Sequence, residues 1–163
     1  MFPRFCLACL FVVVCVGALC AQSQTPFQYD RRMEIPRLES APNQPGYDEC
    51  REGMKAFHRG DMQRAYSWFL ASSQKGFGMG HYMLGHMYHS GKAVRQNAQT
   101  AFQLYLQAAE KGVAEAKYLA GLFYARGYGT PANPAAAVKW LRIAAGEHNL
   151  VQAYEELGKL YYE

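Results

Sequence analysis

AKYLAGLFYARGYG, residues 116–129, is the stretch that decides the fold of this chain. The same pattern stands 36 residues earlier as GHYMLGHMYHSGKA, residues 80–93, and its centre returns 37 residues later as LGKLY, residues 157–161. A period of this length is typical of proteins built from stacked structural repeats. The sequence therefore predicts an array of similar units.

Each unit is predicted to be a hairpin of two helices. Apolar residues at helical spacing precede Gly91 and Gly127, and the spacing resumes after a polar loop. Glycine inside a helix costs about 1 kcal/mol relative to alanine, so Gly85, Gly121 and Gly158 need a compensating contact. We expect a neighbouring helix to lie close to each of these three glycines.

Residues 116–129, followed by Ala137 and Trp140, resemble a Sel1-like repeat, a longer-looped relative of the tetratricopeptide repeat. The resemblance implies an all-α fold, a short right-handed α-solenoid of antiparallel helix hairpins. Residues 78–113 resemble the repeat nearly as well, although Ala93 stands in place of the family's second loop glycine. The predicted division is a signal peptide at 1–21, a proline-rich extended leader at 22–45, repeat units at about 46–77, 78–113 and 114–150, and a C-terminal cap helix at 151–163.

The N-terminus indicates the compartment. An uncharged apolar run from Phe5 to Leu19 follows Arg4 and ends beside the small residue Ala21, as in a secretory signal peptide. The run is shorter than the roughly 20 residues that a membrane span needs. We expect a periplasmic or otherwise exported protein without an integral membrane span after cleavage, with a retained anchor as the alternative.

Cysteine usage predicts a fold without disulfides. Four of the five cysteines lie in or at the end of the predicted signal peptide, which leaves Cys50. We expect Cys50 to act as a small buried apolar residue rather than as a reactive thiol.

Composition and motifs argue against several classes of function. The net charge of +4 is spread along the chain without a basic stripe, which argues against nucleic acid as a partner. No nucleophile elbow, phosphate-binding glycine loop or zinc-binding His-Glu-x-x-His helix occurs, so we predict neither an enzyme nor a cofactor. His81, His86 and His89 form the one suggestive cluster. No cysteine or carboxylate lies within a turn of them to complete a metal shell, so no metal site is predicted.

A partner-binding surface is predicted by transfer from the tetratricopeptide arrangement, in which inward side chains of the first helices lie three residues before the helix glycine and one and four after it. The histidines are included because unpaired burial would be costly for them. An alternative is that the two first-helix tyrosines seal the seam between hairpins. The predicted concave surface consists of Tyr82, His86, His89, Tyr118, Leu122, Arg126, Glu155, Lys159 and Tyr162.

The function predicted from these features is a non-enzymatic, exported protein-binding module. The resemblance implies an adaptor, and a sharper hypothesis is an immunity or inhibitor protein for a toxic exported enzyme. An envelope scaffold fits equally well, because fold and partner are separable in repeat arrays. The alternative from another class is a binder of a small ligand, a metal or a cell-wall fragment.

Overall fold

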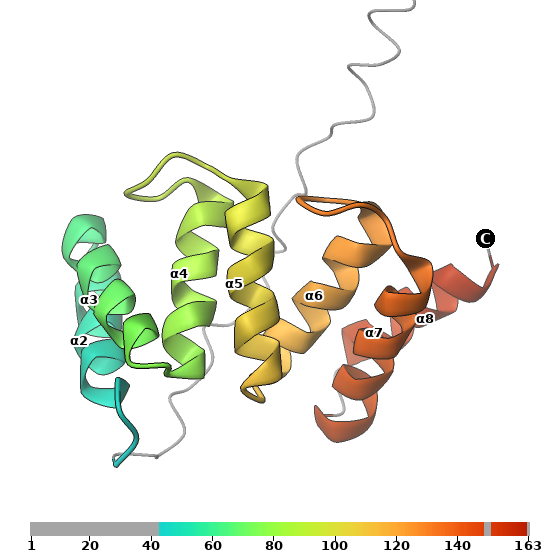
Figure 1. Ribbon diagram of the computed structural model, residues 1–163, viewed down its shortest axis with the longest axis horizontal. Coiled ribbons are helices and arrows are strands. Elements are labelled where there is room, and N and C mark those ends of the chain that lie inside the picture. The colour runs from blue at the N-terminus through green and yellow to red at the C-terminus, as the bar shows by residue number, and fades with distance from the viewer. Residues whose placement is uncertain (1–42, 149–150, 163) are drawn as a thin grey trace, which may run out of the picture. The chain divides into compact units, whose positions relative to one another are not determined.

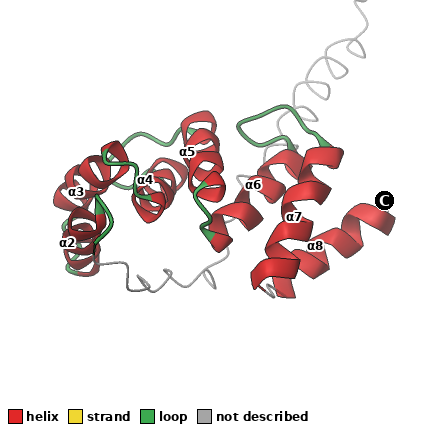
Figure 2. Ribbon diagram, turned by 60° about the horizontal axis from the view of Figure 1, so that its bottom comes forward, coloured by secondary structure: helices red, strands yellow, loops and turns green. Residues whose placement is uncertain are grey.

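The computed structural model describes residues 43–148 and 151–162, which form helices and loops (Figures 1 and 2). The predicted signal peptide and residues 22–42 of the predicted leader lie outside the described residues. None of the described helices is both long and apolar enough to cross a membrane. Within the described ranges the helices are α2 (Tyr47–His58), α3 (Met62–Gln74), α4 (Gly78–Ser90), α5 (Ala98–Glu110), α6 (Ala114–Arg126), α7 (Pro134–His148) and α8 (Val151–Tyr162).

Consecutive helices pack against each other along the chain (Figure 1). The closest pairs are α2 with α3, α4 with α5 and α6 with α7, and these are the hairpins of the three units. The first helices of neighbouring units also touch, α2 with α4 and α6 with α8. The predicted all-α array of helix hairpins is confirmed.

The second helix of each hairpin begins in the same way. Asp61, Asn97 and Asn133 stand 36 residues apart, and each side-chain oxygen accepts a hydrogen bond from the backbone N–H three residues later. The donor–acceptor distances are 3.2, 3.0 and 3.0 Å. Each bond satisfies an N–H that would otherwise lack a partner in the first helical turn. The second helices therefore begin at the same 36-residue interval at which the sequence repeats.

The loops of the second and third hairpins have the same backbone path. Gly91 and Gly127 end α4 and α6 in the left-handed conformation, with φ of 70° and 64°. The N–H of Asn97 then donates to the carbonyl of Tyr88 at 3.0 Å, and the equivalent bond in the third hairpin measures 2.8 Å. These shared bonds fix where the second helix starts relative to the first.

Ala93 stands at the position of the family's second loop glycine, and it adopts the left-handed backbone conformation that favours glycine. Its φ is 65°, against 69° for Gly129 at the equivalent place. An L-residue with a Cβ pays about 1 kcal/mol or more for this conformation. Ala93→Gly is therefore expected to raise the free energy of unfolding by about 1 kcal/mol in urea denaturation.

The reverse change at the equivalent position is the control for Ala93→Gly. A Cβ on Gly129 would lie 2.3 Å from the carbonyl oxygen of Ala98, which is backbone and cannot rotate away. Gly129→Ala should therefore lower the free energy of unfolding. If Ala93→Gly also lowered it, the left-handed conformation would not be the source of strain at this loop.

Two of the three repeat glycines lie against the second helix of their own hairpin. A Cβ on Gly85 would come within 3.0 Å of the Tyr105 ring, and one on Gly121 within 2.7 Å of Leu141 Cγ. Gly158 is the exception, since a Cβ there would meet nothing within 4 Å. The expectation of a close neighbouring helix was right for the first two glycines and wrong for Gly158.

Cys50 is fully buried in α2, as expected for a small apolar residue. Burial raises the pKa of its thiol to about 12, against a smaller opposing effect of a hydrogen bond with Ser72. The thiol therefore stays protonated at neutral pH.

Candidate functional site

The structure divides the nine predicted partner-binding residues into two groups. Tyr82, His86, His89 and Leu122 are buried, with exposed fractions of 2%, 6%, 2% and 2%. In the structure these four do not form the solvent-facing surface that was predicted. Tyr118 is partly buried, and the exposed members are Arg126, Glu155, Lys159 and Tyr162.

The buried tyrosine has a ring contact within its own hairpin, and one buried histidine contacts rings of the next hairpin. The Tyr82 ring centroid lies 5.7 Å from that of Tyr105. The His89 ring makes edge contacts with Phe123 at 5.4 Å and a tilted contact with Tyr128 at 5.7 Å. Tyr118 packs against the apolar cluster that α7 and α8 share, as in the alternative in which first-helix tyrosines seal the seam. The contact of Tyr82 with Tyr105, in contrast, lies within one hairpin.

The expectation that His86 and His89 stay at the surface was wrong, since both are buried. Burial lowers the pKa of His86 to about 4, with smaller contributions from Lys92 and His89. Burial also lowers the pKa of His89 to about 4. Both rings are therefore neutral at pH 7, and burying a neutral imidazole costs far less than burying a charged one.

The histidines do not assemble with other ligands. Burial, followed by the charge of Lys111, lowers the pKa of His81 as well. In the part of the chain that the structure describes, no three histidine, cysteine or carboxylate side chains gather closely enough to hold a metal ion.

Three of the four exposed predicted residues belong to α8, and the fourth, Arg126, lies at the end of α6 and contacts α8. Glu156 of α8 accepts from Lys159 at 2.6 Å and lies 3.6 Å from the Arg126 guanidinium of α6. The ion pair with Arg126 links α6 to α8, whereas the bond with Lys159 lies within α8. Glu155 and Tyr162 of α8 are exposed as well, Tyr162 by 95%.

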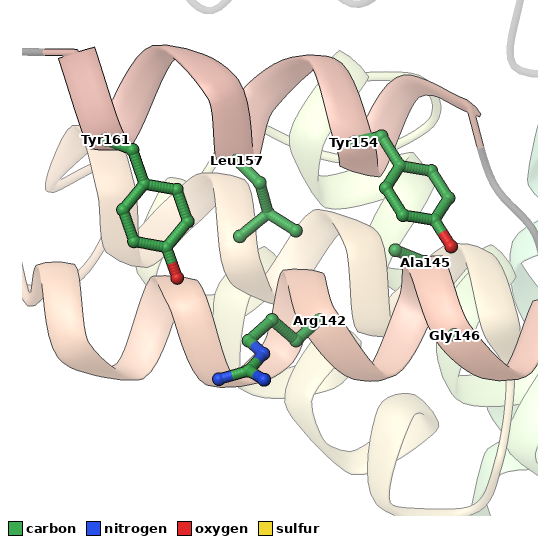
Figure 3. A pocket seen from close by; sticks show the side chains of 6 residues that line it. All are labelled: Arg142, Ala145, Gly146, Tyr154, Leu157 and Tyr161. Carbon is green, nitrogen blue, oxygen red and sulfur yellow. The ribbon is translucent and has the colours of Figure 1, made fainter.

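A pocket of about 330 Å³ lies between α7 and α8 (Figure 3). Arg142 of α7 forms one side of it, and Tyr154 and Tyr161 of α8 stand on the other, on either side of Leu157 (Figure 3). Among the described residues, four of the five exposed large apolar side chains belong to α8: Val151, Tyr154, Tyr161 and Tyr162.

Sequence reasoning missed this pocket, and one signal could have indicated it. LGKLY lies in the C-terminal half of α8, the equivalent of the first helices α4 and α6, and the described residues contain no second helix after it. Side chains that face the second helix in other units are therefore expected to be exposed in this one. The cap helix predicted at 151–163 carries exposed tyrosines as well as the exposed Glu155 and Lys159.

The Sel1 repeat model matches residues 53–77, 78–113 and 114–148, which together are more than half of the chain. The chain belongs to the Sel1 repeat family. Sel1 repeats are typically non-catalytic scaffolds that mediate protein interactions.

Solved structures of longer Sel1 repeat proteins are similar to the chain. A Sel1 repeat protein from Oxalobacter formigenes matches with a TM-score of 0.66 and 29% identity, over 74% of this chain and 36% of that one. The protein c5321, a protective antigen of uropathogenic Escherichia coli strains, matches with a TM-score of 0.68 and 28% identity, over 79% and 28%. The present chain thus spans about a third or less of these two Sel1 repeat proteins.

A third solved structure supports the fold alone. Cysteine-rich protein B of Helicobacter pylori matches with a TM-score of 0.56 and 21% identity, over 69% of this chain and 96% of that one. No match was found among curated proteins.

Proposed function

We propose that this Sel1 repeat chain is a non-enzymatic scaffold that binds another protein through the exposed side of α6 and α8. The observation that carries the proposal is the exposure of Glu155, Lys159 and Tyr162, which share one face of α8 at spacings of four and three. Arg126, also exposed, lies at the end of α6, which its ion pair with Glu156 joins to α8. Arginine and tyrosine are frequent anchors of protein interfaces. Charges of both signs beside an aromatic ring favour a partner with a mixed polar and apolar surface.

A charge exchange tests this surface. Glu155→Lys combined with Lys159→Glu keeps the net charge but reverses the local pattern. We expect the wild-type chain, purified from its native compartment, to carry one partner at near-stoichiometric yield, identified by mass spectrometry. The exchanged variant should bind that purified partner at least about tenfold more weakly, because complementary charges become like charges.

The matched control exchanges another exposed pair of opposite charges. Glu110→Lys combined with Lys111→Glu changes the end of α5 and the turn after it, away from the proposed surface, and again conserves net charge. It should bind as the wild type does. Equal loss in both variants, or loss in neither, would contradict the assignment to α6 and α8. Circular dichroism checks that both remain helical.

We further propose a periplasmic or otherwise exported location, on the strength of the apolar run from Phe5 to Leu19. Within that location the finer proposal is an inhibitor that gives immunity to a toxic exported enzyme, with an envelope scaffold as the alternative. Adding the chain to the captured enzyme should abolish its activity if the inhibitor proposal is right. Capture of several envelope proteins in place of one enzyme would favour the scaffold.

A binder of a small ligand, a metal or a cell-wall fragment is the remaining alternative. It was based on His81, His86, His89 and Tyr82, the last three of which are buried in the structure. Zinc and muropeptides should therefore leave the melting temperature unchanged, whereas a rise that saturates with ligand would revive this alternative.

A further inference from the structure

Each second helix packs on the first helix of the next unit as well as within its own hairpin. This seam between hairpins occurs three times in the described chain, as α3 against α4, α5 against α6 and α7 against α8. The pocket of about 330 Å³ lies in the third seam (Figure 3). The sequence repeat gives each residue that lines it an equivalent in the first two seams.

The tyrosine at one end of the pocket lacks the aromatic partner that its equivalents have. Those equivalents are half-buried, and each makes an edge contact with a ring of the preceding helix, with centroids 6.2 and 5.0 Å apart: Tyr88 on Tyr66, and Tyr124 on Phe102. At the position of these two partners the third seam has Val138. Tyr161 is 67% exposed.

Two further replacements distinguish the third seam. Arg142 stands where the first two seams have leucine, at Leu70 and Leu106. Gly146 stands where they have the longer side chains of glutamine and glutamate, and a Cβ there would meet nothing within 4 Å. The third seam therefore has a cation in place of an apolar side chain, and open space beside it.

The lining of the pocket combines an apolar surface, two phenol rings and one positive charge. Ala145 and Leu157 are 2% and 8% exposed and supply the apolar part. Tyr154 and Tyr161 stand on either side of Leu157, and Arg142 lies on the opposite side (Figure 3). None of the six lining residues is acidic. The charge of the pocket is thus complementary to that of an anion.

We propose that this pocket binds an aromatic carboxylate, which is an aromatic ring joined by a short link to a carboxylate group. The ring packs beside Tyr161, as the ring of Phe102 does beside Tyr124. The carboxylate pairs with the Arg142 guanidinium, whose N–H groups match its two oxygens. A cavity of about 150 Å³ holds benzene, so the pocket has space for both parts. The site shares no lining residue with the surface of α6 and α8 proposed above.

Titration of the purified chain, followed by the NMR signals of its backbone amides, tests the site. N-acetylphenylalanine should shift the signals of the residues that line the pocket and saturate with a Kd of about 1 mM or below. The corresponding amide, which lacks the carboxylate, should bind at least about tenfold more weakly. The proposal is wrong if the acid gives no saturating shift up to about 10 mM, or if the amide binds as tightly as the acid.

The peptide N-acetyl-Gly-Gly-Phe, with a free C-terminal carboxylate, distinguishes the two sources of such a group. Binding at least as tight as that of N-acetylphenylalanine assigns the site to the C-terminal residue of a protein. Weaker binding assigns it to a free small molecule. The acid must bind in either case.

Two variants restore residues of the earlier seams and are therefore expected to fold, which circular dichroism checks. Arg142→Leu removes the charge, and Gly146→Gln fills the open space with the residue of the first seam. Each should weaken binding of N-acetylphenylalanine at least about tenfold.

Lys139→Leu is the matched control, because it removes a positive charge from an exposed position of α7, one turn before Arg142 and outside the pocket lining. Its Kd should stay within about twofold of the wild-type value at physiological salt. Equal loss of binding in all three variants, or loss in none, would contradict the assignment to this pocket. Neither result bears on the charge-exchange test of the partner surface.

Discussion

Acidification from about pH 7 to about pH 4.5 is expected to lower the free energy of unfolding by several kcal/mol, mainly through His86 and His89. The pKa of each is about 4 in the folded chain, chiefly because of burial, against about 6.5 for an exposed histidine. Between these values the unfolded chain binds more protons than the folded chain. The contribution of the two neutral histidines to the free energy of unfolding is therefore fully present above pH 6.5, and it is lost as the pH falls towards 4.

The size of this effect makes it measurable. Each shift corresponds to on the order of 3 kcal/mol, which is a large part of the 5 to 15 kcal/mol that typically separates folded from unfolded domains. Urea denaturation at several pH values between about 7 and 4.5 would give the slope of stability against pH. A free energy of unfolding that stays constant across this window would show that folding does not lower the pKa of the two histidines.

His86→Leu tests the assignment to one residue. Leucine stands at the equivalent position of the next unit, Leu122, where it is 2% exposed, so the site accepts its shape. The variant should lose up to about 1.4 kcal/mol per pH unit of the acid sensitivity, the contribution of one titrating proton. His58→Gln, at an exposed position in the last turn of α2, is the control and should keep the wild-type slope.

Gly121→Ala is expected to lower the free energy of unfolding by about 1 to 3 kcal/mol, although alanine is the better helix former. The added Cβ would lie 2.7 Å from Cγ of Leu141, which is itself fully buried. Neither helix can move away without opening the hairpin.

Gly158→Ala is the matched variant, because it makes the same change at the equivalent position where the space is open. It should leave stability unchanged or raise it by up to about 1 kcal/mol. Helix propensity cancels between the two variants, so their difference measures the cost of the contact alone. Chemical denaturation gives both values. Equal effects at the two positions would mean that α6 and α7 are not in close contact at Gly121.

Most of the fold could be predicted because the residues that recur with its period have strong preferences for particular backbone conformations or close helix contacts. Gly91 and Gly127 end first helices in a conformation that glycine prefers, and Gly85 and Gly121 fit between close helices. The caps at Asp61 and its two equivalents were an unused signal of the same kind. Such features depend only on residues nearby in the sequence or in the adjacent helix. The helices and loops of one repeat therefore predict those of the next.

The candidate site was harder to predict because it depends on what lies over each helix. His86 and Leu122 occupy equivalent positions and are both buried, although one is polar and the other apolar. Helical spacing gave the face of each residue but not whether that face was covered. The same limit applies to Tyr154, which is exposed although Lys117, at the equivalent position of α6, is buried.

The repeated caps and loop bonds also bear on how such a chain changes its length in evolution. An in-frame duplication of 36 residues supplies a complete start for the second helix, because the Asp or Asn cap and the loop glycine lie within every such segment of the array. Each copy also brings the surfaces by which its neighbours already recognise one another. Gene segments of this size can therefore be gained or lost without redesign of the core, and relatives can differ several-fold in length while sharing one unit.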